Sequence, residues 1–404
     1  MKKAFKAELH PNNIQTTRLR QHCGAARWAY NWGLAEILST PEGERWPSAV
    51  DLHKRLNALK GTDALPWGYA VSKCAFQEAL RNLDTAIKNW SASKKGTRKG
   101  PKIKFPRRKT RKRGLGGCRF TGTIKVFDGS VQLPRIGTIR LKEHGYIPTG
   151  RYAQATITEQ AGHWFVSVIA DFATASPELT EDVIGVDVGI KTLATDSDGD
   201  THANPRALAA KTKQLRRWQR RLSRRVKGSA NRTKARVKVA ALHKRVSDIR
   251  KDAHNKACRT IVNKRPAIIV IEDLNVKGMF KNRKLARALA DASLGNFSRV
   301  LSYMAADAGI EVVKAGRFFA SSRLCACCGW KNENLSLSDR TFVCSDCGHT
   351  MDRDLNAAIN LKNTVSSTGI HAYGDHVRPG RASDLAMIGE VGILSQMSTS
   401  GISV

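Results

Sequence analysis

Two Cys-x-x-Cys-Gly sequences are the clearest chemical signal in this chain of 404 residues. Cys325 and Cys328 form the first pair and Cys344 and Cys347 the second, with the fifteen residues 329–343 between them. This is the spacing of a four-thiolate zinc site, in which two tight turns direct their sulfur atoms at one ion. Because four thiolates fill the coordination shell, we expect a structural Zn²⁺.

The remaining cysteines do not extend this pattern. Cys327 lies inside the first pair and does not repeat its spacing, so its role is left open. An odd count of nine, with five in one short window, is not a secreted disulfide framework. We expect the scattered ones to be small buried residues in a reducing compartment: Cys23, Cys74, Cys118 and Cys258.

Three acidic residues form a second candidate site. Asp187 lies within an apolar strand pattern, Glu272 ends the most apolar stretch of the chain, and Asp354 begins a helix after the second cysteine pair. Asp354 could be only a helix cap and Glu272 one end of a surface ion pair. A carboxylate in an apolar strand is costly, however, and usually binds a cation or pairs with a base.

Three carboxylates suit Mg²⁺ or Mn²⁺, and a pair of such ions can activate a water and stabilise the leaving oxygen of a phosphodiester. The overall charge indicates an anionic substrate, because 69 Lys and Arg against 34 Asp and Glu give a net charge of +35. Together the acids and the charge predict a nuclease. No apolar run approaches the length of a membrane span, and we expect a cytoplasmic protein.

The positive charge is concentrated in two segments. Residues 94–113 contain twelve basic residues and no acid, and residues 211–251 contain seventeen with one acid, Asp248. The first segment could be a solvated linker, but repulsion at this density favours contact with a phosphate backbone. The expected nucleic-acid contacts are Lys94, Lys95, Arg98, Lys99, Lys102, Lys104, Arg107, Arg108, Arg216, Arg217, Arg220, Arg221, Arg224 and Arg225.

Length and hydrophobic pattern predict two or three domains that bury a sizeable core. A strand over 2–9 precedes a helical bundle over 12–92, and short β-branched strands over 118–172 predict a small β-barrel or sheet. Because the first strand has no nearby partner, we interpret the bundle as an insertion between it and the later strands. A strand, turn and strand over 183–195 then precede two long basic helices over 207–264.

Several sequences occur in the order found in the TnpB (OrfB) proteins of insertion sequences, which this chain resembles nearly end to end. These proteins are RNA-guided nucleases similar to the miniature type V CRISPR effectors. The matching stretches are Arg27–Leu34, Phe105–Arg107, Gly185–Gly189, Ile271–Met279, Ser321–Ser322 and Asp352–Ala358.

The resemblance implies an α/β and β multidomain fold with an RNase H-like (RuvC) nuclease domain. It makes Asp187, Glu272 and Asp354 the catalytic, magnesium-binding triad and gives Asp352 and Asp273 supporting roles. The implied domains are a wedge-type β-barrel (1–11 and 93–178), a helical recognition lobe (12–92), the nuclease domain (179–363, with the basic hairpin at 207–264 and a zinc ribbon at 318–350) and a disordered tail (364–404).

The implied function is that of a transposon-encoded RNA-guided DNA endonuclease, which cuts by a two-metal RuvC-type mechanism beside a short flanking motif. Its partners would be a guide RNA from the transposon end and double-stranded target DNA, in a monomeric ribonucleoprotein that associates with the nucleoid when bound to DNA. One alternative is a non-cleaving RNA-guided repressor, which loss of one acid would favour. Another is a transposase or transposition accessory protein, although no Tyr or His-hydrophobe-His motif for strand transfer stands out.

Overall fold

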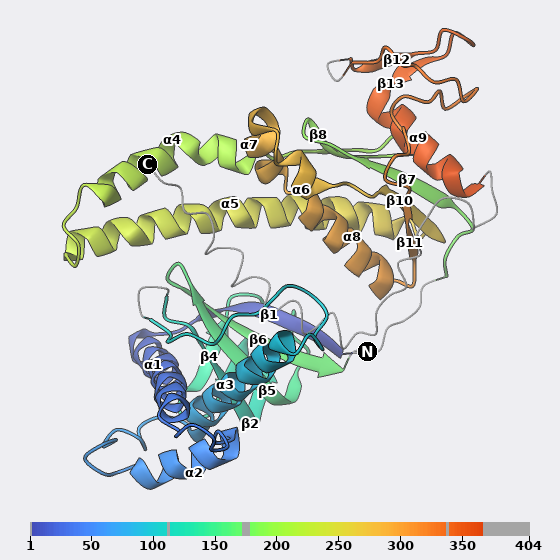
Figure 1. The fold of residues 1–404 in the computed structure, drawn as a ribbon. Coiled ribbons are helices and arrows are strands. Elements are labelled where there is room, and N and C mark those ends of the chain that lie inside the picture. The colour runs from blue at the N-terminus through green and yellow to red at the C-terminus, as the bar shows by residue number, and fades with distance from the viewer. Residues whose placement is uncertain (1, 111–113, 172–177, 337–338, 367–404) are drawn as a thin grey trace. The chain divides into compact units, whose positions relative to one another are not determined.

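The computed structural model describes residues 2–110, 114–171, 178–336 and 339–366. The chain divides into two compact units, residues 1–172 and 173–404 (Figure 1). Within the described residues, none of the helices is long and apolar enough to span a bilayer. Most of the tail expected over 364–404 lies outside the described residues, although the last helix continues through Ser366.

A closed β-barrel is the framework of the first unit and confirms the barrel predicted from the short strands. The first strand of the chain, β1, pairs antiparallel with β6 from Lys2–Asp171 to Leu9–Trp164 and also meets β4 at Leu141. The strands lie in the order β1 (Lys2–His10), β4 (Gly137–Leu141), β3 (Ser130–Leu133), β2 (Gly117–Phe127), β5 (Gly150–Gln160) and β6 (His163–Asp171).

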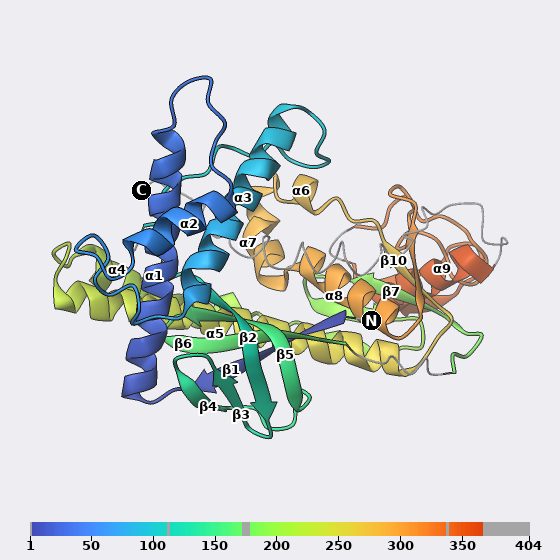
Figure 2. The ribbon, with the colours of Figure 1, turned by 90° about the horizontal axis from the view of Figure 1, so that it is seen from below.

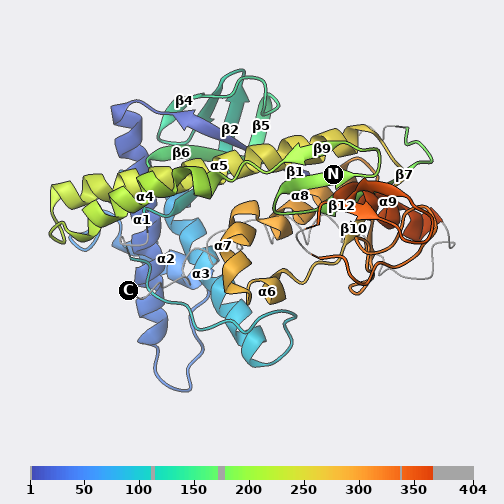
Figure 3. The ribbon, with the colours of Figure 1, turned by 90° about the horizontal axis from the view of Figure 1, so that it is seen from above.

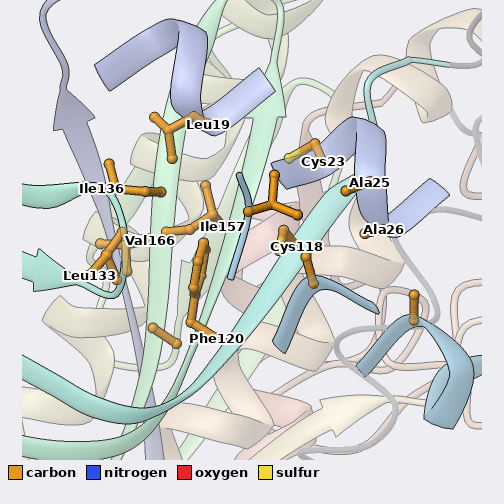
Figure 4. Close-up of a cluster of buried hydrophobic side chains, with 14 of the residues drawn as sticks. Leu19, Cys23, Ala25, Ala26, Cys118, Phe120, Leu133, Ile136, Ile157 and Val166 are labelled. Atoms are coloured by element: carbon orange, nitrogen blue, oxygen red, sulfur yellow. The ribbon is translucent and has the colours of Figure 1, made fainter. Parts of the chain in front are cut away.

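Three helices interrupt the barrel between its first and second strands in sequence: α1 (Asn13–Leu38), α2 (Ala49–Leu59) and α3 (Lys73–Lys94) (Figure 2). Asn12 and Ser48 cap the first two, each in a reciprocal capping box. The helices share the core of the barrel, as Figure 4 shows for Leu19 and Cys23 of α1 beside the barrel residues Phe120 and Ile157.

The second unit contains a five-stranded sheet in the order β11-β10-β7-β8-β9. Three of its strands are parallel, and β8 and β9 run antiparallel at one edge. The strands are β7 (Val183–Val188), β8 (Thr192–Asp196), β9 (Thr201–Ala203), β10 (Ile268–Glu272) and β11 (Glu311–Ala315).

Helices cover both faces of this sheet. The long hairpin of α4 (Ala207–Ser223) and α5 (Ala230–Asn263), clear in Figure 3, confirms the two basic helices predicted over 207–264. Its second helix packs with α8 (Leu294–Asp307) against one face, and α9 (Arg353–Ser366) packs against the other. The shorter elements are α6 (Val276–Met279), α7 (Arg283–Ala292), β12 (Thr341–Val343) and β13 (Thr350–Asp352).

Alternation along the strands decides which side chains meet α9. Ile184, Val186 and Val188 of β7 enter the core shared with α5 and α8, so Gly185 and Asp187 lie on the opposite face. A Cβ atom at Gly185 would overlap the carbonyl oxygen of Ala358 and would lie 2.5 Å from the amide nitrogen of Lys362. The backbone of α9 therefore rests directly on β7 at this glycine.

We predict that Gly185→Ala will destabilise the second unit, because the clash is with helix backbone that cannot move aside by changing a rotamer. The expected loss is about 1–3 kcal/mol, the usual cost of overpacking, read as a lower thermal midpoint. Gly295→Ala on α8 is the matched control, since its Cβ would meet only Val276 at an ordinary 3.8 Å. Equal thermal midpoints for the two variants would show that the contact of α9 with β7 is not as described.

Candidate functional site

The strand register places two of the three candidate acids side by side. Strand β10 runs parallel to β7, with Val270 opposite Gly185 and Ile271 opposite Val186. The next position along both strands brings Glu272 beside Asp187. Because side chains alternate along a strand, both carboxyl groups lie on the face of the sheet that α9 covers.

Helix α9 brings in the third acid. Its Ala358 rests on Gly185, and Asp354 precedes Ala358 by four residues, so both lie on the same side of the helix. The charge of Asp354 acts on Asp187, as does that of Glu272. The structure thus brings the three predicted acids together from two neighbouring strands and one helix.

Burial and mutual repulsion dominate the electrostatics of this cluster. Burial raises the pKa of Asp187 well above its ordinary value, and the charges of Glu272 and Asp354 raise it further. Burial also raises the pKa of Glu272, against the opposing charge of Arg353. A cluster of oxygen ligands whose negative charges repel one another is suited to a divalent cation such as Mg²⁺ or Mn²⁺.

Neighbouring side chains hold the cluster in place. The buried hydroxyl of Ser321 donates a hydrogen bond to Oε1 of Glu272. This bond offsets part of the rise in the pKa of Glu272 that burial causes, and it fixes the orientation of the carboxyl group. The guanidinium of Arg353 also donates to the carbonyl oxygens of Ser336 (3.0 Å) and Asp339 (3.3 Å). The start of α9 is therefore tied to the loop that precedes β12.

Two buried asparagines of α9, which sequence reasoning missed, tie the helix to the first cysteine pair. Asn356 accepts a bond from the amide of Ala326 (2.9 Å) and donates to the carbonyl of Leu324 (2.6 Å). Asn360 donates to the carbonyls of Ser321 (2.8 Å) and Leu324 (2.7 Å). The available signal was two amides four residues apart within the otherwise apolar stretch 355–361, because buried amides need partners.

The two acids expected to be supporting have partners of their own. The Oδ1 atom of Asp352 accepts from the amides of Asp354 (2.9 Å) and Leu355 (3.2 Å), so Asp352 caps α9. Asp273 pairs with Arg317, whose Nη2 lies 2.6 Å from its Oδ2. Asp352 thus holds the start of α9, and Asp273 holds the side chain of Arg317.

The four predicted cysteines form a compact sulfur cluster, with all their Sγ atoms within 4.8 Å of one another. The two pairs have the same backbone hydrogen bond: Gly329 donates to the carbonyl of Cys325 (2.9 Å), and Gly348 to that of Cys344 (3.1 Å). Both glycines have positive φ, at 77° and 71°, a conformation that glycine adopts without strain.

The chemistry of the sulfur cluster suits a structural metal ion. Burial disfavours ionisation of Cys344, but hydrogen bonds from the amides of Cys347 and Asp346 and from the neighbouring thiols outweigh it and lower its pKa to about 7, while the pKa values of Cys328 and Cys347, which share those thiol contacts, are raised. A thiol that ionises near neutral pH is a ready metal ligand. Cys327 is exposed and lies outside the cluster, whereas the scattered Cys23, Cys74, Cys118 and Cys258 are buried, as predicted.

The first basic segment is exposed but anchored. Asn31 of α1 accepts from the amide of Lys109 (2.7 Å) and donates to its carbonyl (2.9 Å), and the ring of Phe105 lies edge-on to Trp90 at 4.9 Å. The predicted contact residues Lys94, Lys95, Arg98, Lys99, Lys102, Lys104, Arg107 and Arg108 are all exposed. Fixed in this way, they present a line of positive charge.

The second basic surface lies along α4 and the turn that follows it. Its six predicted arginines, at positions 216, 217, 220, 221, 224 and 225, are exposed. Lys213, Arg216 and Arg220 of α4 and Arg287 of α7 line a hollow of about 510 Å³. Asp291 accepts from the amides of Leu208 and Ala209, so α4 is held at its first turn while its cationic side remains open.

Comparison with known proteins identifies the family. The family described as "Probable transposase" (OrfB_IS605) matches residues 163–283, and a Cas12f1-like TNB domain matches residues 295–361. A Streptomyces pristinaespiralis protein, "Putative RNA-guided DNA endonuclease", is 35% identical over 100% of this chain and 98% of its own length. The chain belongs to the TnpB (OrfB) family.

Further similarities accompany this membership. The Escherichia coli relative "Putative RNA-guided DNA endonuclease InsQ" is 29% identical to the present chain, over 94% of this chain and 95% of its own length. A Cas12f1–sgRNA–target DNA complex covers 86% of this chain and 82% of its own, at 14% identity and a TM-score of 0.48. A third family model, described as a helix-turn-helix domain, matches residues 1–40 of this chain. In the structure this region contains β1 and the long helix α1.

We predict that Asp187→Asn will stabilise the metal-free protein at neutral pH. Because the folded pKa of Asp187 is raised, the folded state retains a proton that the unfolded chain releases above the ordinary value of 3.8. Wild-type stability therefore falls as the pH rises from that value through the folded pKa, by about 1.4 kcal/mol for each pH unit, and the asparagine avoids this loss.

Thermal midpoints measured in a chelator across the acid to neutral range check this prediction, with Asp182→Asn as the exposed control. The advantage of Asp187→Asn should shrink toward pH 4. Adding Mg²⁺ should raise the midpoint of the wild type more than that of the variant. A variant less stable than the wild type at neutral pH would mean that burial and the neighbouring acids do not raise the pKa of Asp187 in the folded state.

Proposed function

We propose that this chain is an RNA-guided DNA endonuclease and that Asp187, Glu272 and Asp354 are its active site. The observation that carries the proposal is the convergence of these carboxyl groups on one face of the sheet, beneath α9. The names of the relatives support the reaction class. The net charge of +35 supports a polyanionic substrate.

The second unit would be the RuvC-like, RNase H-type nuclease domain. Its mixed sheet with helices on both faces is compatible with that fold, and residues 179–363 are its proposed extent. The three acids would hold two Mg²⁺ or Mn²⁺ ions, which when bound supply an activated water and charge stabilisation at the phosphodiester. Ser321 would keep the carboxylate of Glu272 oriented, and Arg353 would balance part of the negative charge.

Cys325, Cys328, Cys344 and Cys347 would bind one structural Zn²⁺ in a ribbon over residues 318–350. All four positions of a tetrahedral ion are then filled by protein, so the zinc would have no part in the chemistry. Its effect on the active site would pass through Asn356 and Asn360, which join the first cysteine pair to α9. The ribbon would thereby fix the helix that carries Asp354.

The two basic surfaces would bind RNA and the guide–target heteroduplex. In such complexes base pairing reads the sequence, and the protein contacts backbones and a short flanking motif. The proposed wedge barrel (1–11 and 93–178) and recognition lobe (12–92) would contribute the basic segment that Asn31 and Phe105 anchor. With one such acidic cluster in the part of the chain that the structure describes, the working particle would be a monomeric ribonucleoprotein that cuts the strands in turn.

A non-cleaving RNA-guided repressor on the same scaffold is the main alternative. It would need the basic surfaces but not a buried Asp187 whose pKa is raised by burial and by the charges of Glu272 and Asp354, an arrangement that opposes folding in the absence of metal. The observed cluster therefore favours a nuclease.

We predict that the chain, purified with its co-expressed transposon-end RNA, will cut matching double-stranded DNA in Mg²⁺. Glu272→Gln and Asp354→Asn should each lower the cleavage rate by at least about 1,000-fold, because each removes a metal ligand charge. Both should retain the RNA, since the cationic surfaces are unchanged. Sequencing of the bound RNA and single-turnover cleavage measure the two properties separately.

Asp182→Asn is the control for charge alone and should cut normally. Normal cutting by either triad variant would overturn the assignment of the acids. A discrete bound RNA together with tight binding of matched DNA, but no cleavage by the wild type in Mg²⁺ or Mn²⁺, would favour the repressor.

We predict that the purified protein contains one zinc per chain and that Cys344→Ser will lose it. Removing one of four thiolates breaks the shell, and the ribbon and the start of α9 should then loosen. Metal analysis and protection of α9 amides in hydrogen exchange provide the measurements. Cys327→Ser is the matched control, because this exposed neighbour lies outside the sulfur cluster and its loss should change neither result.

A further inference from the structure

Phe318 is an apolar side chain in an unusual position. Its exposed fraction is 95%, the highest among the large hydrophobic residues in the described part of the chain. Gly316, Ala320 and Ser322, which are close to it in sequence, are small. A ring this exposed takes little part in the packing of the folded chain.

The chain holds this ring on a fixed turn. The amide of Phe319 donates to the carbonyl of Gly316 (2.9 Å), and the side chain of Phe319 packs against the core beneath α9. On the other side of Phe318, Arg317 donates to Asp273 through Nε (3.0 Å) and Nη2 (2.6 Å). The residues before and after Phe318 are thus both anchored while its ring remains in solvent.

The turn lies next to the acidic cluster. Ala315, which ends β11, is opposite Glu272 in the strand register, and Phe318 follows it by three residues. Ser321, three residues further on, donates its hydroxyl hydrogen to Glu272. Three residues of chain span at most about 10 Å, which is roughly the length of three stacked nucleotides.

The charged side chains near the turn are compatible with a nucleic acid. Lys314 and Arg317 both pair with Asp273, at 3.9 and 2.6 Å, whereas Arg323, five residues after Phe318, is exposed. An exposed aromatic ring together with an exposed cation is a combination by which proteins hold a single strand, since the ring stacks on a base and the cation contacts a phosphate.

We infer that Phe318 stacks on an unpaired base of the strand being cut, within a few nucleotides of the scissile phosphate, and so sets which phosphate reaches Asp187, Glu272 and Asp354. The inference rests on the proposed function. Phe318 is a positioning residue, because it would contact the substrate away from the reacting atoms. The ligand is a nucleobase in single-stranded DNA, recognised by its face rather than by its edges.

The test measures binding separately from cleavage. The full chain with its RNA carries Asp187→Ala to prevent cutting, and a single-stranded DNA oligonucleotide carries 2-aminopurine at successive positions. Stacking on Phe318 should quench the fluorescence at one or two adjacent positions. Phe318→Ala should remove that quenching and weaken binding about 5- to 150-fold, whereas Phe318→Trp should retain both.

Two further variants separate stacking from other effects. Phe318→Leu keeps an apolar side chain without a ring and should behave as Phe318→Ala. Tyr303→Ala on α8, whose helix packs on the opposite face of the sheet, should leave the quenching unchanged. The thermal midpoint without DNA should change by less than about 2 °C in Phe318→Ala. A larger loss of stability would assign the ring to the fold and overturn the inference.

Cleavage in the chain with Asp187 intact gives an independent result. With Phe318→Ala, cuts should spread over neighbouring phosphates, and Phe318→Trp should restore the wild-type positions. Wild-type cut positions and quenching in Phe318→Ala would overturn the inference and leave the proposed function standing. If the wild type does not cut at all, the proposed function fails, while position-specific quenching that depends on the ring still supports base stacking at Phe318.

Discussion

The close approach of α9 to β7 at Gly185 is the contact on which the candidate site depends. A helix backbone can rest on a strand only where the strand carries no side chain, and here even a methyl group would overlap the carbonyl of Ala358. The contact fixes both the distance of α9 from the sheet and the rotation of the helix about its own axis. Asp354, four residues before Ala358, is thereby placed against Asp187, and the asparagines of the same helix are directed at the segment that carries Ser321 and Cys325.

The acids of the second unit differ in the charges that surround them. Acids are scarce in this chain, and several in the second unit are neutralised by cations: Asp196 bonds to Lys264 (2.7 Å), and Asp291 to Arg250 (3.1 Å). Each pair fixes a part of the framework: the first joins the end of α5 to β8, and the second lies at the start of α4. In the cluster beneath α9, by contrast, Asp187 experiences the charges of two other acids and of Arg353. The strain of this arrangement is what a divalent cation would relieve.

Much of this arrangement was predictable from local pattern. The cysteine spacing predicted a cluster that the structure contains, and the strand and helix patterns predicted the barrel and the basic hairpin. The roles of the acids remain proposals. What could not be predicted depends on contacts between distant segments. Nothing in the local sequence of Ser321 points to Glu272, 49 residues earlier, or shows that Asn356 reaches Ala326. Such hydrogen-bond partners are determined by how distant segments pack together, and the hydrophobic periodicity of a single segment does not reveal them.

The position of the sulfur cluster explains why a structural metal would matter to a distant reaction. The turn of Phe318, the hydroxyl of Ser321 and the first cysteine pair occupy one continuous stretch of eleven residues, 318–328, and α9 holds it at Leu324 through two side-chain bonds. A metal at the end of this stretch would limit its motion. The stretch would then transmit that rigidity to Glu272 at one point and to the exposed ring at another. A nuclease must place one phosphate of the DNA against three carboxylates that repel one another. This positioning is most accurate where one segment of the protein holds both the DNA strand and a carboxylate that binds the metal.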